Sequence, residues 1–548
     1  MEQTKDNTVQ TKNAFLDTNT FYFLVGGLGG VLIFILMYGV QRLSFTNIEW
    51  IYDINGDLLQ HYLGWELYRN GDWQFPLGLT DTMAYPNSIS VLYTDSIPFL
   101  AIFFKLFRGV LPEHFQYLGA YGLLCFALQG GMGSIIMKRF TSSRFLNILG
   151  TIIIILSPVM IYRMYYHTAL ASHFLVLFAV YLWFCCDEIS FKRAIISWTV
   201  LGVLCSGIMI YFLPIVGLIT VAFAIKQAIT RAYPWYQCVL IVVAYCASAL
   251  LTIWILGGFY GDFELTAHGF GVYSANLNTL YNSMGIGSLL PCIRTQFGQE
   301  EGLGYLGFGV IVLALVAITF TIICKCQKKA LITDKHYTIA MVVSTLWLLI
   351  TSIILAVGPN IYWNHHLLFS YTLPNFLHEI LSIVRSSGRF IWITVYVIEF
   401  YAFRYVFKIQ KEQIIVNVMA IACFLQILDM CQCFFQKTYT PEPSPLQAEE
   451  WNLLAQDHDK IILMDIFVNS DLYIFADYAY QNDMKLSQYR FSRSLETTIK
   501  DNIEANENEI KAGNIDPDAI YVFTDSTRPT NTDFTFYELN GYIVGVYE

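Results

Sequence analysis

Long runs of apolar residues recur along the chain and are separated by shorter polar segments. Each run is long enough for a helix to cross roughly 30 Å of hydrocarbon. Eleven such runs begin near residues 21, 114, 145, 172, 194, 209, 237, 304, 337, 389 and 413. A further apolar segment, residues 97–111, is too short to span and is expected to be re-entrant or interfacial. The pattern predicts an all-α polytopic membrane protein with about eleven transmembrane helices.

The pattern changes in the last part of the chain. Segments such as IILMDIFV, AIYVFTD and FTFYELNGYIVGVYE are typical of strands, and Asn540-Gly541 is typical of a hairpin turn. The segments EEWNLLAQ and ETTIKDNIEANENEI have helical periodicity. Residues 434–548 hold 20 acidic and 8 basic side chains, a net charge of −12 in a chain whose total is −10. The sequence therefore predicts a small, acidic C-terminal α/β domain.

Composition and charge predict how the chain is oriented in the membrane. Hydrophobic residues make up 55% of the 548 residues and charged residues only 14%, which excludes a water-soluble globular protein. With a cytoplasmic N-terminus, sixteen basic residues fall on the inner side and eight on the outer side, as the positive-inside rule favours. The expected organisation is a cytoplasmic tail 1–20, a membrane domain 21–433 with outer loops 41–113 and 257–303, and an extracytoplasmic domain 434–548.

The first of these outer loops contains the candidate acids. In WIYDINGDLLQH, Asp53 and Asp57 lie four residues apart, and the segment from Asp57 to Gly71 predicts a short amphipathic helix lying in the membrane interface. Asp57 and His61 then share one helical face, and Asp95 is a further acid of the same loop. A carboxylate at this position suits a general base or a metal ligand. The alternative for Asp57 is an N-cap that accepts backbone N–H bonds.

Arginines recur near the predicted outer ends of the spans. Arg385 and Arg389 lie four residues apart around Ser-Ser-Gly, and a guanidinium binds phosphate oxygens in a bidentate manner. This pair is the best candidate anion site, with Arg163 and Arg294 as possible helpers. The alternative is that the pair snorkels from a helix end toward water.

Other conspicuous residues are expected to be structural. Singly, His167 and His173 are expected to fill interfacial or core positions. The adjacent pair His365-His366 lacks a third metal ligand, and the glycines of GGLGG, residues 26–30, lie inside a span and favour helix packing. No Walker-type string occurs in the sequence, which disfavours ATP-driven transport by this chain alone.

Six strings occur in the order GDLLQHYLGWELYRNGDWQFPLGL, LYTDSIPFLAIFFK, HTALASHFLVL, GVYSANLNTLYN, EEGLGYLGFG and IVRSSGRFIW. In these strings, which fall within residues 45–400, the chain resembles a bacterial family of multispan membrane proteins related to the GT-C glycosyltransferases. GT-C enzymes use polyprenyl-phosphate sugars and carry an acidic residue in the first outer loop. The resemblance therefore implies a GT-C-like membrane domain in which Asp57 is that acid, with Asp53 in reserve.

The resemblance implies a membrane glycosyltransferase on the outer face of the bacterial cytoplasmic membrane. It would move a sugar from a polyprenyl-phosphate carrier to an envelope glycan, lipid or protein. Asp57 is then the base or metal ligand, helped by His61 and Asp95, and the arginines hold the donor phosphate; both metal-dependent and metal-independent transfer are compatible with the resemblance. The alternative is a transporter or flippase of lipid-linked saccharides without transferase activity, which would distribute polar groups through the spans. Neither hypothesis involves nucleic acid.

Overall fold

The computed structural model describes residues 18–52, 56–261, 269–327, 335–436, 444–530 and 533–547. Within them, ten helices are long and apolar enough to cross a membrane, and a bent pair raises the number to eleven if it forms one span. The bent pair joins Asn375–Ser382 to Ser387–Val406 at an angle of 77°. The ten are Asn19–Tyr38, Leu118–Lys138, Arg144–Ile161, Thr168–Cys185, Phe191–Ile208, Phe212–Ile229, Trp235–Ile255, Phe308–Cys326, Tyr337–Val357 and Glu412–Asp429.

Each of the eleven predicted apolar runs overlaps one of the ten helices or the bent pair, so the prediction of a polytopic helical bundle is confirmed. The bundle is built from α2 (Asn19–Tyr38), α5 (Leu118–Lys138), α6 (Arg144–Ile155), α7 (Pro158–Ile161), α8 (Phe174–Cys185), α9 (Phe191–Ile208), α10 (Phe212–Ile229), α11 (Trp235–Ile255), α12 (Phe308–Cys326), α13 (Lys335–Val357), α15 (Ile391–Val406) and α16 (Glu412–Asp429). The bent pair comprises α14 (Asn375–Ser382), the short helix η6 (Ser387–Phe390) and α15. The segment at residues 97–111 forms the eight-residue α4 (Pro98–Lys105), which is too short to span.

Helices α2 and α5 pack closely because small residues face each other. A Cβ atom on Gly26 would lie 2.2 Å from the carbonyl oxygen of Gly130, and one on Gly30 would lie 2.0 Å from that of Phe126. Such separations are shorter than any van der Waals contact, so only glycine allows these backbones to approach. The predicted packing role of the GGLGG glycines is confirmed.

Between α2 and α5 the chain forms a cap on one end of the bundle. The cap contains α3 (Asp57–Asn70), β1 (Leu79–Ala84), β2 (Asn87–Ser90), the 3-10 helix η3 (Val91–Thr94) and α4. Helix α3 has the predicted bounds, but every residue from Leu58 to Arg69 is buried. The expectation of an amphipathic interfacial helix is therefore wrong, because the C-terminal region covers the side that was expected to face water. For example, Tyr489 donates a 2.5 Å hydrogen bond to the carbonyl of Gln60.

The C-terminal region is an α/β unit, as predicted. Its elements are α17 (Glu449–Asp457), β5 (Lys460–Leu463), α18 (Asn469–Gln481), β6 (Lys485–Leu486), α19 (Glu496–Ala512), β7 (Ala519–Phe523), β8 (Phe534–Leu539) and β9 (Tyr542–Tyr547). The sheet order is β6-β5-β7-β9-β8, with β5 parallel to β6 and β7 and with β9 antiparallel to β7 and β8. Asn540 and Gly541 have φ values of 51° and 88°, as a type I′ hairpin requires.

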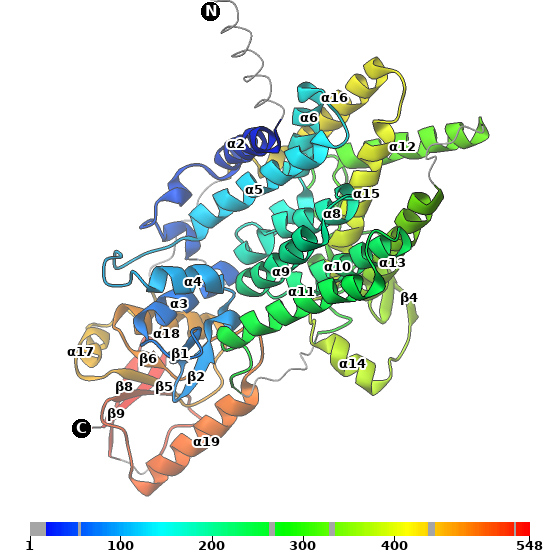
Figure 1. The fold of residues 1–548 in the computed structure, drawn as a ribbon. Coiled ribbons are helices and arrows are strands. Elements are labelled where there is room, and N and C mark those ends of the chain that lie inside the picture. Colours follow the sequence, from blue (N-terminus) through cyan, green and yellow to red (C-terminus); the bar gives the residue numbers. More distant parts are fainter. Residues whose placement is uncertain are drawn as a thin grey trace, which may run out of the picture.

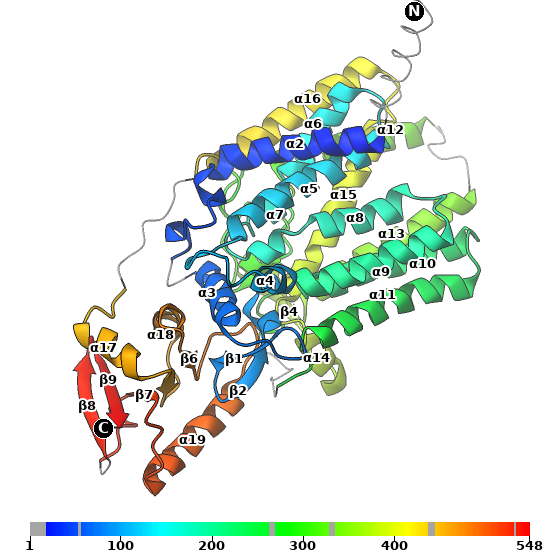
Figure 2. The same cartoon turned by 60° about the vertical axis from the view of Figure 1, so that its left-hand side comes forward.

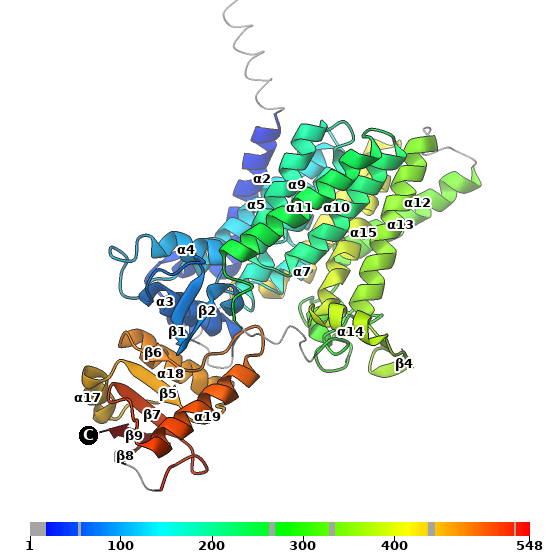
Figure 3. The ribbon, with the colours of Figure 1, turned by 60° about the horizontal axis from the view of Figure 1, so that its bottom comes forward.

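The C-terminal region docks on the cap, at the end of the bundle where α2 ends (Figures 1 and 2). Lys485 forms a 2.6 Å ion pair with Asp81, and Tyr52 donates a 2.7 Å hydrogen bond to Asp477. Helix α14 and the hairpin of β3 (Asn360–Trp363) and β4 (His366–Ser370) lie at the same end (Figure 3). Segments from distant parts of the sequence therefore meet at this one end of the bundle.

Candidate functional site

A cavity of about 250 Å³ lies where the cap, the bundle and the C-terminal region meet. Asp57 and Asp95 of the cap line it, and so do Arg385 and Arg389 from the bend before α15. Residues 490–492 of the C-terminal region close another part of its wall. The structure thus brings the predicted acid and the predicted arginine pair into one hollow, although they are more than three hundred residues apart in the sequence.

Asp57 is the first residue of α3 and follows Gly56, which is the N-cap. The alternative reading of Asp57 as an N-cap is therefore wrong. Its Oδ1 lies 2.8 Å from Nη2 of Arg490, and its Oδ2 lies 2.9 Å from Nε2 of His167. Burial acts to raise the pKa of this carboxyl, but the hydrogen bond and charge of His167 and the charge of Arg490 hold the pKa below its ordinary value. Asp57 is consequently an ionised carboxylate with two fixed partners.

Arg490 is contributed by the C-terminal region. Its Nη1 donates a 2.6 Å hydrogen bond to the hydroxyl of Tyr473 in α18, which fixes the guanidinium beside Asp57. The backbone N–H of Ser492 donates a 2.8 Å hydrogen bond to the carbonyl of Tyr93 in η3, so the loop that carries Arg490 is attached to the cap. No sequence pattern marked Arg490, because its partner lies at the opposite end of the chain.

His61, His167 and Asp95 form a compact group beside Asp57, with one potential ligand atom of each side chain within 4.8 Å of those of the others. His61 is only 1% exposed, and burial together with the charge of His167 lowers its pKa to about 3. Burial raises the pKa of Asp95 to about 6, although His167 and Arg389 oppose the shift. His61 is therefore a neutral imidazole at pH 7. This group includes the predicted His61 and Asp95 and adds His167, for which a structural role was expected.

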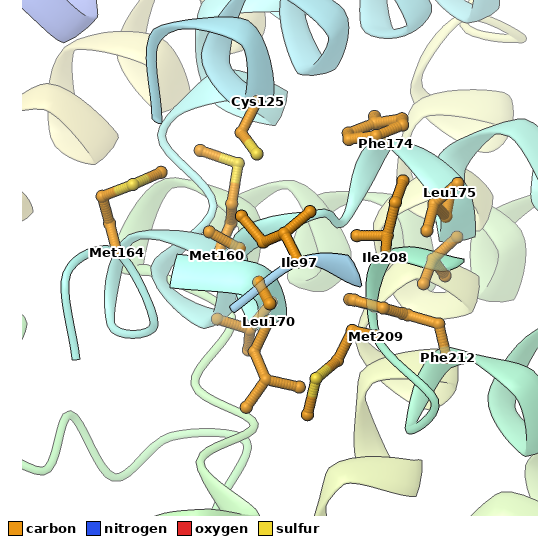
Figure 4. Close-up of a cluster of buried hydrophobic side chains, with 14 of the residues drawn as sticks. Ile97, Cys125, Met160, Met164, Leu170, Phe174, Leu175, Ile208, Met209 and Phe212 are labelled. Carbon is orange, nitrogen blue, oxygen red and sulfur yellow. The ribbon is translucent and has the colours of Figure 1, made fainter. Parts of the chain in front are cut away.

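Asp95 is placed by a strained turn. Asp95 and Ile97 have φ values of 58° and 54°, a region that a β-branched residue such as Ile adopts rarely. Ser96 between them donates a 2.6 Å hydrogen bond to the carbonyl of His61, which ties the turn to α3. Ile97 is fully buried in an apolar cluster that also contains Met160 and Leu170 (Figure 4). Packing of this apolar cluster therefore holds the turn in place beneath the cavity.

Arg389 and Arg163 share one carboxylate. Nη2 of Arg389 lies 2.6 Å from Oε2 of Glu301, and Nη1 of Arg163 lies 3.1 Å from Oε1. Burial acts to raise the pKa of Glu301, but the two guanidinium groups hold it below its ordinary value. Arg389 also lies over the ring of Tyr211, 4.1 Å from its centroid, and is 5% exposed. Because Arg389 is buried, the alternative of a snorkelling side chain is wrong for this residue.

Arg385 and Arg389 each keep N–H donors for a ligand. Nη1 of Arg389 is buried and has no hydrogen-bond partner among the described residues. Arg385 lies over the ring of Tyr273, 4.7 Å from its centroid, and its one hydrogen bond among the described residues is a long 3.4 Å contact to the Tyr273 hydroxyl. An aromatic face orients a guanidinium without using its N–H groups. The arrangement suits an anion with several oxygen acceptors.

Other predicted residues do not join the cavity. Arg294 is exposed and is not among the residues that line the cavity. Arg163 is 2% exposed and acts on the cavity only through Glu301. Asp53 lies outside the described residues. The rings of His365 and His366 lie 3.9 Å apart at a tilt of 40° on the exposed β3–β4 turn. Neither histidine belongs to the group of potential metal ligands found among the described residues.

Besides Arg490, the functional candidates that the sequence did not mark are His167, Glu301 and Tyr273. All three occur in the strings that carried the family resemblance, HTALASHFLVL, EEGLGYLGFG and GVYSANLNTLYN. Their presence in these strings was the available signal. Their local patterns gave no role, because each finds its partner only across the cavity.

The sequence matches a family described as Domain of unknown function (DUF6311) over residues 27–431. Residues 450–547 match a second description, DUF6311 C-terminal domain. The site described above therefore combines residues of both matched regions, with Arg490 from the second and the other candidates from the first. No curated protein matches the sequence. Because the first match covers more than half of the chain, the protein belongs to the DUF6311 family.

Proposed function

We propose that this protein is a glycosyltransferase that moves a sugar from a polyprenyl-phosphate carrier to an envelope acceptor on the outer face of the bacterial cytoplasmic membrane. The observation that carries the proposal is the shared cavity, in which an ionised carboxylate, Asp57, faces the guanidinium groups of Arg385 and Arg389. A sugar phosphate presents an anion on one side of the reacting carbon and accepts a hydroxyl nucleophile on the other. The cavity offers groups for both sides.

In the proposed reaction, the hydroxyl oxygen of the acceptor forms a new bond to the anomeric carbon of the sugar. The bond between that carbon and the phosphate oxygen breaks, and its electron pair stays on the polyprenyl phosphate. Arg385, Arg389 and Arg490 stabilise this developing charge through charge-assisted hydrogen bonds. The acceptor proton leaves along a hydrogen bond to Asp57, whose oxygens each keep a lone pair beyond those used by His167 and Arg490.

A lipid carrier fits the surroundings of the cavity. Helix α14 and the residues that join it to Arg385 expose large apolar side chains, among them Phe376 at 62%, Ile380 at 58% and, just after the helix, Ile383 at 44% exposure. The neighbouring β3–β4 hairpin exposes Leu368 and Phe369 as well. A run of exposed apolar side chains beside arginines matches a ligand that has an acyl-like chain and an anionic head. A water-soluble sugar donor would not need this surface.

The test compares envelope glycans in cells that lack the protein and in cells restored with wild type or with Asp57→Asn at matched abundance. We expect wild type to restore the glycan and Asp57→Asn to reduce it by about 100-fold or more, the usual size of a lost acid–base contribution. The control is Asp72→Asn, which removes an acid whose side chain is 95% exposed. Full restoration by Asp57→Asn, or an unchanged glycan profile in the deletion strain, would overturn the proposal.

The alternative of a transporter for lipid-linked saccharides is favoured by a different observation. Gln129, His173, Tyr396 and Glu399 are buried inside the bundle, and His173 forms a 2.9 Å hydrogen bond with Tyr396. Polar residues within spans often mark a transport path. A transporter of this kind should lose function in Glu399→Gln and keep it in Asp57→Asn, the reverse of the result expected for the enzyme.

A further inference from the structure

The imidazole groups beside the cavity have unused nitrogen atoms. Both ring nitrogens of His61 are buried without a hydrogen-bond partner in the part of the chain that the structure describes, and so is Nδ1 of His167. A buried polar atom without a partner costs about 1–3 kcal/mol, so most are satisfied by protein, water or an ion. The rings of His61 and His167 lie 5.7 Å apart between centroids, and both carry buried ring nitrogens without a partner among the described residues. This arrangement indicates that a ligand binds these nitrogens.

The carboxylate of Asp95 completes a set of three donors. The ligand atoms of His61, His167 and Asp95 all lie within 4.8 Å of one another, close enough for one ion to contact each of them. The three residues come from α3, from the turn after η3 and from the loop before the 3-10 helix η4 (Thr168–Ala171). Asp95 and His167 also line the cavity, so an ion held here would face it.

Asp57 is not one of the three donors but contacts one of them, His167. Its Oδ2 lies 2.9 Å from Nε2 of His167, and in the neutral imidazole that carries its proton on Nε2 the lone pair of Nδ1 points away from Asp57. Metal-bound histidines commonly donate their other N–H to a carboxylate in this way, which fixes the tautomer and the ring orientation. Arg490 in turn holds the second oxygen of Asp57. Asp57, itself held by Arg490, therefore fixes the His167 ring in an orientation that suits a metal ligand.

We propose that His61, His167 and Asp95 bind a divalent first-row transition-metal ion of the zinc type, with Asp57 as the outer carboxylate. Two imidazoles and one carboxylate favour such an ion over Mg²⁺ or Ca²⁺, which prefer oxygen ligands. Three protein ligands leave one position open toward the cavity. The site goes beyond the proposed sugar transfer and can be tested without any sugar or acceptor.

The test uses the purified full-length protein in detergent, stripped with a chelator and then incubated with ZnCl2 or MnCl2 before gel filtration and elemental analysis. We expect about one zinc ion per chain for wild type and for the control His365→Ala, which removes an exposed histidine. His61→Ala and His167→Ala should lose the bound ion, and Asp57→Asn should weaken binding by about 10–100-fold. The elution profile and the thermal midpoint without metal confirm folding, and His61→Gln replaces any alanine variant that fails to fold.

Two results would overturn the metal site. One is wild-type protein that retains neither ion, and the other is folded His61 and His167 variants that both retain it. Arg389→Lys separates this inference from the proposed function, since it should impair the envelope glycan and leave zinc binding unchanged. The zinc measurement uses purified protein and no glycan, so failure of the proposed function would leave this test unchanged.

Discussion

Among the described residues, the polar groups at the cavity and within the bundle are built in different ways. The cavity group, which comprises Asp57, Glu301, Arg389 and Arg490, consists of charged side chains in ion pairs of 2.6 and 2.8 Å that line the cavity. The bundle group, Gln129, His173, Tyr396 and Glu399, is at most 2% exposed, and hydrogen bonds between uncharged groups join Tyr396 to Gln129 and His173. Charges that are paired yet open to a cavity suit the binding of a charged ligand, whereas neutral bonds between spans suit helix packing.

The largest effect should come from breaking the cavity group at its centre. Glu301→Ala removes the carboxylate shared by Arg163 and Arg389 and leaves two buried guanidinium groups without it. Loss of one partner from a buried ion pair costs about 3–5 kcal/mol, so the thermal midpoint in detergent should fall strongly. The control is Glu300→Ala, because Glu300 is exposed. An equal midpoint for Glu301→Ala and wild type would show that the pairs do not stabilise the protein.

A smaller effect is expected from removing Arg490, the charged residue that the C-terminal region adds to the cavity. Arg490→Gln takes away the 2.8 Å partner of Asp57 and one cation of the cavity. We expect restoration of the envelope glycan to fall by about 10–100-fold at matched abundance, since a charge-assisted hydrogen bond contributes roughly 1.5–3 kcal/mol. Lys500→Gln, whose side chain is 60% exposed on α19, is the matched control. If both variants restore the glycan equally, Arg490 has no part in the site.

The smallest effect should come from the bundle group. Tyr396→Phe removes the hydroxyl that bonds His173 at 2.9 Å and Gln129 at 3.3 Å. A drop of about 1 kcal/mol in unfolding free energy is expected, with no change in the glycan. Tyr166→Phe, at a side chain that is 69% exposed, should change neither quantity. Loss of the glycan in Tyr396→Phe with normal abundance would instead support a path through the spans and the transporter alternative.

Local patterns predicted much of the fold. The apolar runs, the bounds of α3 and the Asn540-Gly541 hairpin all depend on residues close together in the sequence, and all are confirmed. The environment of α3 was predicted wrongly, because its cover comes from Tyr489 in the C-terminal region. Likewise, only some residues of the candidate site were predicted from the sequence. Asp57, Arg385 and Arg389 stood out by type and spacing, whereas Glu301 has no local feature that marks it as the partner of two arginines.

The sequence by itself determined that the chain is a bundle of apolar helices followed by an acidic α/β unit, because hydrophobic periodicity is a local property that each segment carries alone. Only the tertiary structure decided that His167, Glu301 and Arg490 surround Asp57 and Arg389. The physical reason is that these ion pairs join residues far apart in the sequence, and their geometry exists only after the bundle, its cap and the C-terminal region have packed together.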